Sequence, residues 1–393
     1  MGMENESRGM SGRTLSSRKE FLAGLGGTIA LGAVGCSTHV PIRTPALAGD
    51  MAWGMLLHVG RNMWGEVLDW RKPPHSPEEE RLMYPNHKLT KYGTWPQIPR
   101  NYLQFDDATW REETDLMRQE GLNMAMIDIG EAFVYPSHPE LAVKGSWTPD
   151  RMREELHRLR TMGLEPVPKL NFSACHDTWL REYNRMPASR KYYEVVADVI
   201  RDVAEVFDWP RYFHIGYDEE MWVAQNERNL VIIRQKDLWW HDFLYTVAEV
   251  ERHGARAICW SDKYWTGRDE FRKRMPKSVL QSNWCYRADF SEKKMVWNER
   301  FEREGGWGED QHGAITFLEL EKAGYDQLPA TGNFWGEPAA DAVVRFCKEH
   351  VDPSRLKGFL MSTWAGTTAM EKKKVTDGIR EFAAVRRHYY HES

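Results

Sequence analysis

The sequence has few cysteines and no strong excess of either charge. Its 393 residues include five cysteines, 53 Lys and Arg, and 58 Asp and Glu, for a formal net charge of -5. A dominant nucleic-acid or anionic-membrane surface usually needs a basic excess, so this balance argues against one. The four cysteines beyond Cys36 have no C-x-x-C spacing, which indicates neither a disulfide framework nor a zinc site. They are Cys175, Cys259, Cys285 and Cys347.

The sequence also lacks the composition of a polytopic membrane protein or a disordered chain, with 41% hydrophobic residues and a mean hydropathy of -0.64. One weakly apolar run, Ala23–Val34, follows Ser16-Ser17-Arg18-Lys19-Glu20-Phe21-Leu22. It is shorter than the roughly 20 apolar residues that a permanent membrane helix needs. This pattern resembles a twin-arginine export signal with Lys19 in place of the second Arg.

The export-like segment ends in Ala33-Val34-Gly35-Cys36-Ser37, which is similar to a bacterial lipoprotein cleavage box. We therefore expect residues 1–36 to be an export signal and residues 37–50 a linker. The predicted location is the periplasm or the outer membrane, with membrane anchoring only through a lipid on Cys36. An ordinary disordered N-terminus that contains Gly and Ala is the alternative.

The chain is rich in aromatic residues, with 18 Trp, 15 Tyr and 15 Phe. Trp is large and semi-polar, so this number indicates either a bulky core or platforms that stack on flat apolar faces. Sugar rings have such faces. Core packing remains the alternative for any single Trp.

From about residue 51 the sequence alternates short apolar runs with amphipathic segments of helical length, which is typical of a parallel sheet. Eight such units predict an α/β fold, a (β/α)8 TIM barrel that forms a single catalytic domain over residues 51–393, because a closed sheet leaves no unpaired edge. The expected strands lie near Ala52–Val59, Asn123–Ile129, Glu165–Asn171, Tyr212–Tyr217, Ala255–Trp260, Ser278–Trp284, Asp326–Phe334 and Lys357–Trp364.

Helix signals separate the expected strands. Thr148-Pro149 opens a helix that closes at Met162-Gly163, and a second helix is expected over Asn229–His253, before Gly254. Two long segments, Arg71–Tyr102 and Arg287–Gln311, follow the first and sixth strands. Both come after strand C-termini, where barrel enzymes build their sites, so we expect both to wall a cleft.

Tryptophans and carboxylates gather where the expected strands end. In a barrel these positions converge on one mouth, and acids among aromatic walls suit a glycoside site. One carboxyl must then stay protonated near neutral pH, which burial and a neighbouring anion achieve. A Trp that caps the core, or an acid that caps a helix, is the alternative for each single residue. The residues are Trp64, Trp260, Trp284, Trp335, Trp364, Asp128, Glu131, Asp218, Glu219, Asp262 and Glu337.

The segment Phe213-His214-Ile215-Gly216-Tyr217-Asp218-Glu219 resembles the H-[IV]-G-G-D-E signature of glycoside hydrolase family 20, the β-N-acetylhexosaminidases. Further segments are similar to the family's strand motifs in the same order, so the likeness covers roughly residues 51–265. Gly163–Phe172 resembles its third strand, Trp53–Asn62 its first, Gly121-Leu122-Asn123 the opening of its second, and Trp260-Ser261-Asp262 the end of its fifth.

This resemblance implies a retaining glycoside hydrolase that acts on oligosaccharides or glycoconjugates, without cofactor or metal. Glu219 would be the general acid/base, and Asp218 would orient the substrate's 2-acetamido group, whose carbonyl oxygen acts as the nucleophile. Substrate contacts are expected from the strand-end tryptophans and acids and from matched-segment residues. The full set is Arg61, Asp128, Glu131, Asn171, His214, Tyr217, Trp260, Asp262, Trp284, Trp335, Glu337 and Trp364.

The sequence departs from the family at several sugar-binding positions. Trp53 stands in place of an Arg, His58 of an Asp, Asp128 of a His, Glu131 of an Asp, and Tyr217 of a Gly. No acid follows Trp364, although Trp335-Gly336-Glu337 offers a hydroxyl contact. Contacts to the terminal sugar are therefore expected to be rebuilt, which leaves the sugar, the linkage and exo or endo action open.

Three alternatives stay open. One is a glycosidase for a non-acetamido sugar, in which Asp218, Asp262 or Asp128 attacks carbon. Another is a non-catalytic glycan-binding lipoprotein on the same barrel. The third is a metal-dependent barrel enzyme such as an isomerase, using His58, His176, His214 and the carboxylates.

Overall fold

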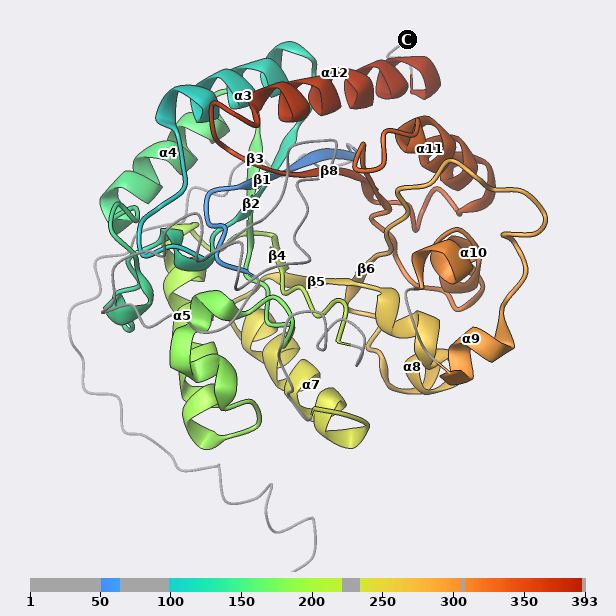
Figure 1. Cartoon of the computed structure of the whole chain (residues 1–393), viewed down its shortest axis with the longest axis horizontal. Coiled ribbons are helices and arrows are strands. Elements are labelled where there is room, and N and C mark those ends of the chain that lie inside the picture. Colours follow the sequence, from blue (N-terminus) through green and yellow to red (C-terminus); the bar gives the residue numbers. More distant parts are fainter. Residues whose placement is uncertain (1–50, 64–98, 221–233, 305–307, 391–393) are drawn as a thin grey trace, which may run out of the picture. The chain divides into compact units, whose positions relative to one another are not determined.

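Eight parallel strands form a barrel surrounded by helices in the computed structural model of the chain (Figure 1). The structure describes residues 51–63, 99–220, 234–304 and 308–390. The expected export signal, the linker, Cys36 and Trp64 lie outside these residues. The strands are β1 (Ala52–His58), β2 (Met124–Asp128), β3 (Glu165–Lys169), β4 (Tyr212–His214), β5 (Arg256–Trp260), β6 (Leu280–Ser282), β7 (Ala330–Thr331) and β8 (Gly358–Gly366).

The sheet runs in the order β6-β5-β4-β3-β2-β1-β8-β7, and backbone hydrogen bonds join its two ends. Isolated bridges pair Gln281 with Gln327 and Trp284 with Ala330. In the same seam Leu328 N–H donates to Gln281 O at 2.8 Å, and Ala330 N–H donates to Asn283 O at 2.8 Å. The ring therefore closes between β6 and β7, and the prediction of a TIM barrel is confirmed.

Several strands end earlier than the apolar runs predict. β4 stops at His214 instead of Tyr217, because Gly216, Tyr217 and Glu219 have φ values of 75°, 70° and 54° and leave the extended region. β7 covers two residues of the expected nine-residue run, whereas β8 continues past Trp364 to Gly366. These early ends free the residues after the strands to form loops at the mouth.

The helices are α3 (Asp107–Gln119), α4 (Pro149–Thr161), α5 (Arg190–Val206), α7 (Asp237–Arg252), α8 (Arg268–Arg274), α9 (Glu299–Glu304), α10 (Ile315–Lys322), α11 (Ala339–His350) and α12 (Lys372–Tyr389). Short helical turns are η1 (Gly130–Ala132), η2 (Pro139–Leu141), η3 (Thr178–Arg185), η4 (Asp262–Thr266) and η5 (Glu309–Gly313). None of the helices in the described ranges is long and apolar enough to cross a membrane.

The capping residues predicted for α4 are found at its two ends. Thr148 accepts the N–H of Arg151 at 3.3 Å at the start of α4, and Gly163 has a φ of +81° just past its end. The expected helix over Asn229–His253 is shorter: α7 begins at Asp237, and Lys236 before it has a φ of 52°. The expected loop Arg287–Gln311 contains α9 and the start of η5. Of Arg71–Tyr102, residues 71–98 lie outside the described part.

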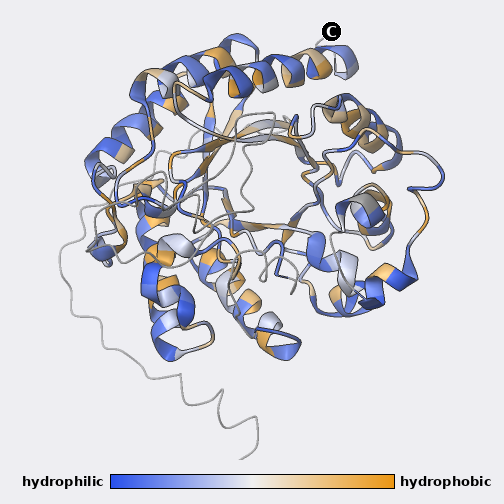
Figure 2. Cartoon of the chain, viewed as in Figure 1, coloured by the Kyte–Doolittle hydropathy of each residue, from blue (hydrophilic) through white to orange (hydrophobic). Residues whose placement is uncertain are grey.

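Many aromatic residues pack in the layer between strands and helices, where the helices turn their apolar sides toward the barrel (Figure 2). Trp53, which stands at the position of a family Arg, packs at 5.1 Å from Phe359 and at 5.2 Å from both Phe382 and Tyr390, measured between ring centroids. The core alternative is therefore right for Trp53, and equally for Trp110, Trp147, Trp239 and Trp240.

A polar group fills the barrel interior below the mouth. His58, Asp128, Lys169 and His214 are register neighbours on β1 to β4, and all are buried. The Lys169 ammonium donates to Asp128, and His58 Nδ1 lies 3.5 Å from Asp128 Oδ2. Burial opposes ionisation of Asp128, but Lys169 and His58 together outweigh it and lower its pKa to about 2. Asp128 is thus one half of a buried ion pair.

Candidate active site

The site forms at the turn after β4, where the backbone lies directly against β3. A Cβ on Gly216 would come within 1.9 Å of Asn171 Oδ1, and the φ of this residue is +75°, so both space and conformation require glycine. Asn171 Oδ1 accepts the N–H of Tyr217 at 3.3 Å. The turn takes Asp218 and Glu219 out of the strand, where consecutive side chains would point to opposite faces.

Asp218 is held by three residues of the segment after β3. Asn171 Nδ2 donates to its Oδ1 at 2.9 Å, Ser173 Oγ donates to its main-chain oxygen, and His176 Nε2 lies 3.3 Å from its Oδ2. Burial raises the pKa of Asp218, and the Glu219 carboxylate adds to this rise while His176 opposes it. One carboxyl oxygen is therefore fixed by an amide and the other faces an imidazole.

Glu219 shares the same imidazole. His176 Nε2 lies 3.2 Å from Glu219 Oε2, so one nitrogen reaches both acids. The side chain of Glu219 is 18% exposed, against 7% for Asp218, which makes Glu219 the more accessible of the two. From the sequence, His176 was considered only as a ligand in the metal-dependent alternative. Its position shortly after the family-like third strand could have indicated that it lies near Asp218 and Glu219.

Asp262, two residues after β5, contacts the backbone of Glu219. Its Oδ2 accepts the backbone N–H of Glu219 at 2.8 Å. Burial, followed by the charges of Asp218 and Glu219, raises the pKa of Asp262 well above its usual range. The structure thus brings Asp262 into the acid cluster, but through the backbone of Glu219.

A buried ion pair supports the turn from below. The Arg234 guanidinium bonds to Glu220, and Arg234 Nη2 donates to Phe172 O at 2.8 Å. Glu220 Oε1 also accepts the N–H of Ala174 at 2.7 Å. These contacts tie the residues after β4 to the segment after β3, and so fix the two acids relative to His176.

Aromatic rings line the β5, β6 and β8 side of the mouth. The ring centroid of Trp364, a half-buried residue with a φ of 51°, lies 6.1 Å from Trp260, 5.6 Å from His58 and 6.5 Å from Tyr286. Tyr286 stacks on Trp284 at 5.3 Å. Burial, followed by the charges of Glu309, Asp218 and Glu219, raises the pKa of Tyr286. Sequence reasoning missed Tyr286.

Trp335 and Glu337 form an outer rim instead of the floor. Trp335 is 39% exposed, its Nε1 donates to Glu309 Oε2 at 3.3 Å, and the Arg287 guanidinium lies 4.5 Å from its ring centroid. Glu337 bonds Arg287 at 3.0 Å and accepts the N–H of Ala288 at 3.0 Å. These contacts join the loops after β6 and β7. Contact of Trp335 and Glu337 with substrate stays a prediction.

The structure does not bring Tyr217 into the mouth. Its hydroxyl lies 2.8 Å from Thr246 Oγ1 on α7, and its ring packs edge-on against Trp239 at 5.6 Å and Phe243 at 5.1 Å. The substrate contact expected of Tyr217 does not fit this position. His214 also lies below the site: its Nδ1 accepts the N–H of Gly216 at 3.1 Å and its ring is 4.4 Å from Trp260.

Arg61 and Glu131 hold the loop after β1. Glu131 accepts the backbone N–H of Arg61 at 2.8 Å and that of Asn62 at 3.0 Å. The Arg61 guanidinium bonds Glu371, just before α12, at 2.5 Å. With Asp128 paired to Lys169, three predicted sugar contacts are thus engaged in structural bonds, which accounts for them without substrate.

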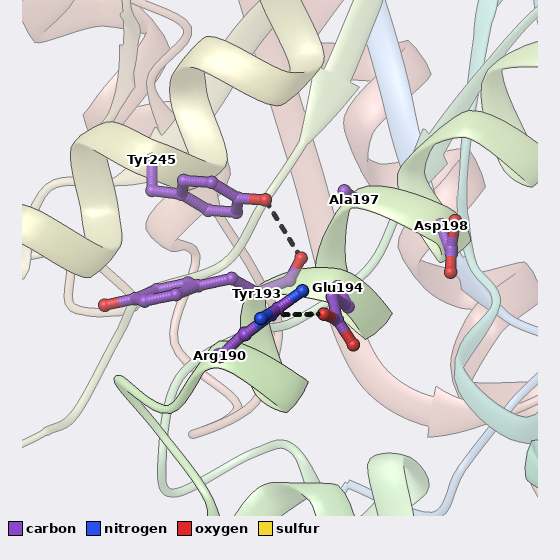
Figure 3. Close-up of a pocket in the computed structure, with 6 residues that line it drawn as sticks. All are labelled: Arg190, Tyr193, Glu194, Ala197, Asp198 and Tyr245. Carbon is purple, nitrogen blue, oxygen red and sulfur yellow. Dashed lines mark hydrogen bonds and ion pairs between the residues drawn. The ribbon is translucent and has the colours of Figure 1, made fainter. Parts of the chain in front are cut away.

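Within the described ranges, no group of three or more His, Cys, Asp or Glu is arranged to hold a metal ion. A hollow of about 520 Å³ lies between α5 and α7, lined by Arg190, Tyr193, Glu194, Ala197, Asp198 and Tyr245 (Figure 3). It sits in the helix layer and not at the carboxyl ends of the strands, where barrel enzymes place their catalytic groups.

No protein-family model matches the chain. Hexosaminidase D from Bos taurus is 27% identical over 135 residues, which cover 31% of this chain and 39% of that protein. The chain therefore aligns with well under half the length of this curated relative.

Among solved structures, the β-N-acetylhexosaminidase from Bacteroides fragilis has a TM-score of 0.52 at 12% identity, over 85% of this chain and 65% of that one. The pneumococcal virulence factor StrH has a TM-score of 0.52 at 13% identity, over 86% and 85%. The exo β-N-acetylglucosaminidase from Vibrio harveyi has 0.51 at 12%, over 84% and 54%. The chain thus has the barrel fold of the family 20 β-N-acetylhexosaminidases, in a divergent form.

Proposed function

We propose that this chain is a glycoside hydrolase that cleaves N-acetylhexosaminides with retention, by substrate assistance. The observation that carries this proposal is the placement of Asp218 and Glu219 around His176 Nε2, at 3.3 Å and 3.2 Å, in the mouth of the barrel. The relatives and structural neighbours include proteins named as hexosaminidases, which supports the same assignment.

In the proposed mechanism Glu219 donates a proton to the leaving oxygen and later takes one from water. Its greater exposure suits this contact with substrate. Asp218 holds the N–H of the 2-acetamido group and stabilises the positive charge that develops when the acetamido oxygen attacks the anomeric carbon. Asn171 fixes the orientation of Asp218 for that task.

The aromatic wall favours an acetamido sugar. Trp260, Trp284, Tyr286 and Trp364, which end β5, follow β6 and lie on β8, form one connected set of rings. Trp364, the half-buried member of the set, can stack on the sugar, and the buried rings of Trp260, Trp284 and Tyr286 behind it keep the reacting groups in a dry environment.

Two other carboxylates considered as nucleophiles are already engaged, which favours substrate assistance over direct attack. Asp128 is bonded to Lys169 inside the barrel, and Asp262 accepts the backbone N–H of Glu219. A carboxylate nucleophile would have to give up these bonds to reach an anomeric carbon.

The test is turnover of an aryl N-acetylglucosaminide by the wild type, Glu219→Gln and Asp218→Asn. We expect each variant to lose about 10²- to 10⁴-fold in kcat, the usual contribution of a general acid or base and of a charge-stabilising group. Glu304→Gln, at an exposed helix position, is the matched control and should match the wild type. A wild type that binds glycans but shows no turnover would instead make the chain a glycan-binding protein.

We also propose that residues 1–36 direct export and that Cys36 carries a lipid anchor. The support is the sequence pattern around Arg18-Lys19 and Cys36. In a bacterial host, the Cys36→Ser variant should move from the membrane fraction to the soluble fraction. Equal partitioning of the variant and the wild type would contradict the anchor.

A further inference from the structure

We propose that Asp262 is a positioning residue of this site, which fixes the backbone of Glu219 so that its carboxyl stays in the mouth. This inference rests on the proposed role of Glu219 as general acid/base. It gives Asp262 a different role from the sugar contact or nucleophile that its place at a strand end suggests.

Glu219 has an unusual backbone conformation. Its φ of 54° lies in the left-handed region, which a residue with a Cβ occupies only when its surroundings hold it there. The Oδ2 of Asp262 accepts the N–H of this same residue at 2.8 Å. The bond therefore acts on the peptide group that precedes Glu219, one of the two whose orientations determine where its side chain leaves the backbone.

The end of β5 holds the turn at two points. Trp260 N–H donates to Gly216 O at 3.0 Å, at the start of the turn, and Asp262 accepts at Glu219, at its end. Asp218, between them, is held from the other side by Asn171 and Ser173. The segment after β3 thus contacts both carboxyl groups through His176, and Asp262, after β5, adds a bond to the backbone of Glu219.

Buried residues and hydrogen bonds to β6 and the residue that follows it hold the turn that contains Asp262. It opens η4, in which Tyr264 and Trp265 are fully buried, and Ser261 N–H donates to Ser282 O on β6 at 3.3 Å. The Trp265 indole donates to Asn283 Oδ1 at 3.2 Å. An acceptor in a turn held in this way transmits the geometry of β5 and β6 to Glu219, as a group that positions a catalytic side chain must do.

Two variants separate this role from general stability. Asp262→Asn keeps an oxygen that can accept the Glu219 N–H, whereas Asp262→Ala removes it. Ser261→Ala is the matched control, because Ser261 lies in the same turn and its Oγ bonds Gln281 at 3.1 Å and not Glu219.

The kinetic readout is the dependence of kcat on the leaving group, using phenyl and dinitrophenyl N-acetylglucosaminides. A misplaced general acid slows a poor leaving group but hardly affects a good one, so Asp262→Ala should lose about 10- to 100-fold on the phenyl substrate and about 3-fold or less on the dinitrophenyl substrate. Asp262→Asn and Ser261→Ala should stay near the wild type on both. Equal losses on both substrates, or none, would overturn the proposal.

Crystal structures of the wild type and both Asp262 variants give a readout that does not depend on turnover. Glu219 should keep a positive φ in the wild type and Asp262→Asn, and leave the left-handed region or move its carboxyl in Asp262→Ala. An unchanged Glu219 in Asp262→Ala would refute the positioning role even if no aryl glycoside is cleaved. If the wild type shows no turnover but Glu219 is displaced in Asp262→Ala as expected, only the proposed reaction is refuted.

Discussion

At the scale of single residues, buried charges set much of the energetics of this barrel. Lys169 and Asp128 form an ion pair in the barrel interior, with side chains 0% and 2% exposed. Breaking such a pair from one side leaves an uncompensated charge away from water, which is more harmful than the intact pair is helpful.

We therefore expect Lys169→Met to lower the free energy of unfolding by about 3–5 kcal/mol, the usual cost of removing one partner of a buried pair. The measurement is denaturant-induced unfolding at pH 7. The double variant Lys169→Met/Asp128→Asn should recover part of the loss, because it removes the stranded charge. A double variant that is no better than the single one would contradict this reading.

Acid should weaken the same pair. The folded pKa of Asp128, about 2, lies below its ordinary value of 3.8, so its stabilising contribution is present above about pH 4 and is lost as the pH falls toward 2. Unfolding measured between pH 5 and pH 2 should show this loss in the wild type and a smaller one in Asp128→Asn. Identical pH dependence in the two proteins would argue against the pair.

For Glu113 on α3 we expect the opposite dependence of folding stability on pH. Burial raises its pKa to about 9 from an ordinary 4.5. As the pH rises, the Glu113 carboxyl therefore loses its proton in the unfolded chain before it does so in the folded protein. Glu113 thus lowers the free energy of unfolding as the pH rises from about 4.5 toward 9. Glu113→Gln should be more stable than the wild type by a few kcal/mol at pH 8 and about equal to it at pH 4. The exposed neighbour Glu112, changed to Gln, is the control; a Glu113→Gln variant with no gain at pH 8 would contradict the prediction.

At the scale of elements, the turn after β4 carries the site. Gly216 and Gly254 both have positive φ, at +75° and +79°, but a Cβ at Gly216 would meet Asn171 while one at Gly254 would meet nothing within 4 Å. Gly254→Ala should cost about 1 kcal/mol of stability through its backbone conformation alone. Gly216→Ala should cost more and also abolish turnover, because it displaces Asn171 from Asp218. Unfolding and kinetics of the two variants make the comparison, and equal effects would contradict it.

Local chemistry decided which elements could be predicted. Thr148 and Gly163 bound α4 as expected, because a capping hydroxyl and a left-handed glycine act within one helix turn. The end of β4 could not be predicted, since the left-handed conformation of Tyr217 depends on its packing against α7 and on Asn171, in the segment after β3. Tyr286 was missed for the same reason: its contacts with Trp284 and Trp364 follow from the fold of a long loop.

At the scale of the whole molecule, the barrel could be predicted from eight alternating units, and the location of the candidate site follows from the convergence of strand ends. That reasoning placed Asp218, Glu219 and the ring of Trp260, Trp284 and Trp364 together. It did not separate residues in the mouth from those just below or behind it, such as His214. Residues at equivalent strand ends lie at the same end of the barrel, but only packing determines where each side chain points.

The most direct test of the account is hydrolysis of an aryl-glycoside panel that differs only in the group at carbon 2. We expect turnover of the N-acetylglucosaminide, the N-acetylgalactosaminide or both, and none of the matching glucoside and galactoside, because the proposed nucleophile is the acetamido oxygen. Cleavage of the 2-hydroxy sugars alone would contradict substrate assistance while leaving the barrel in place.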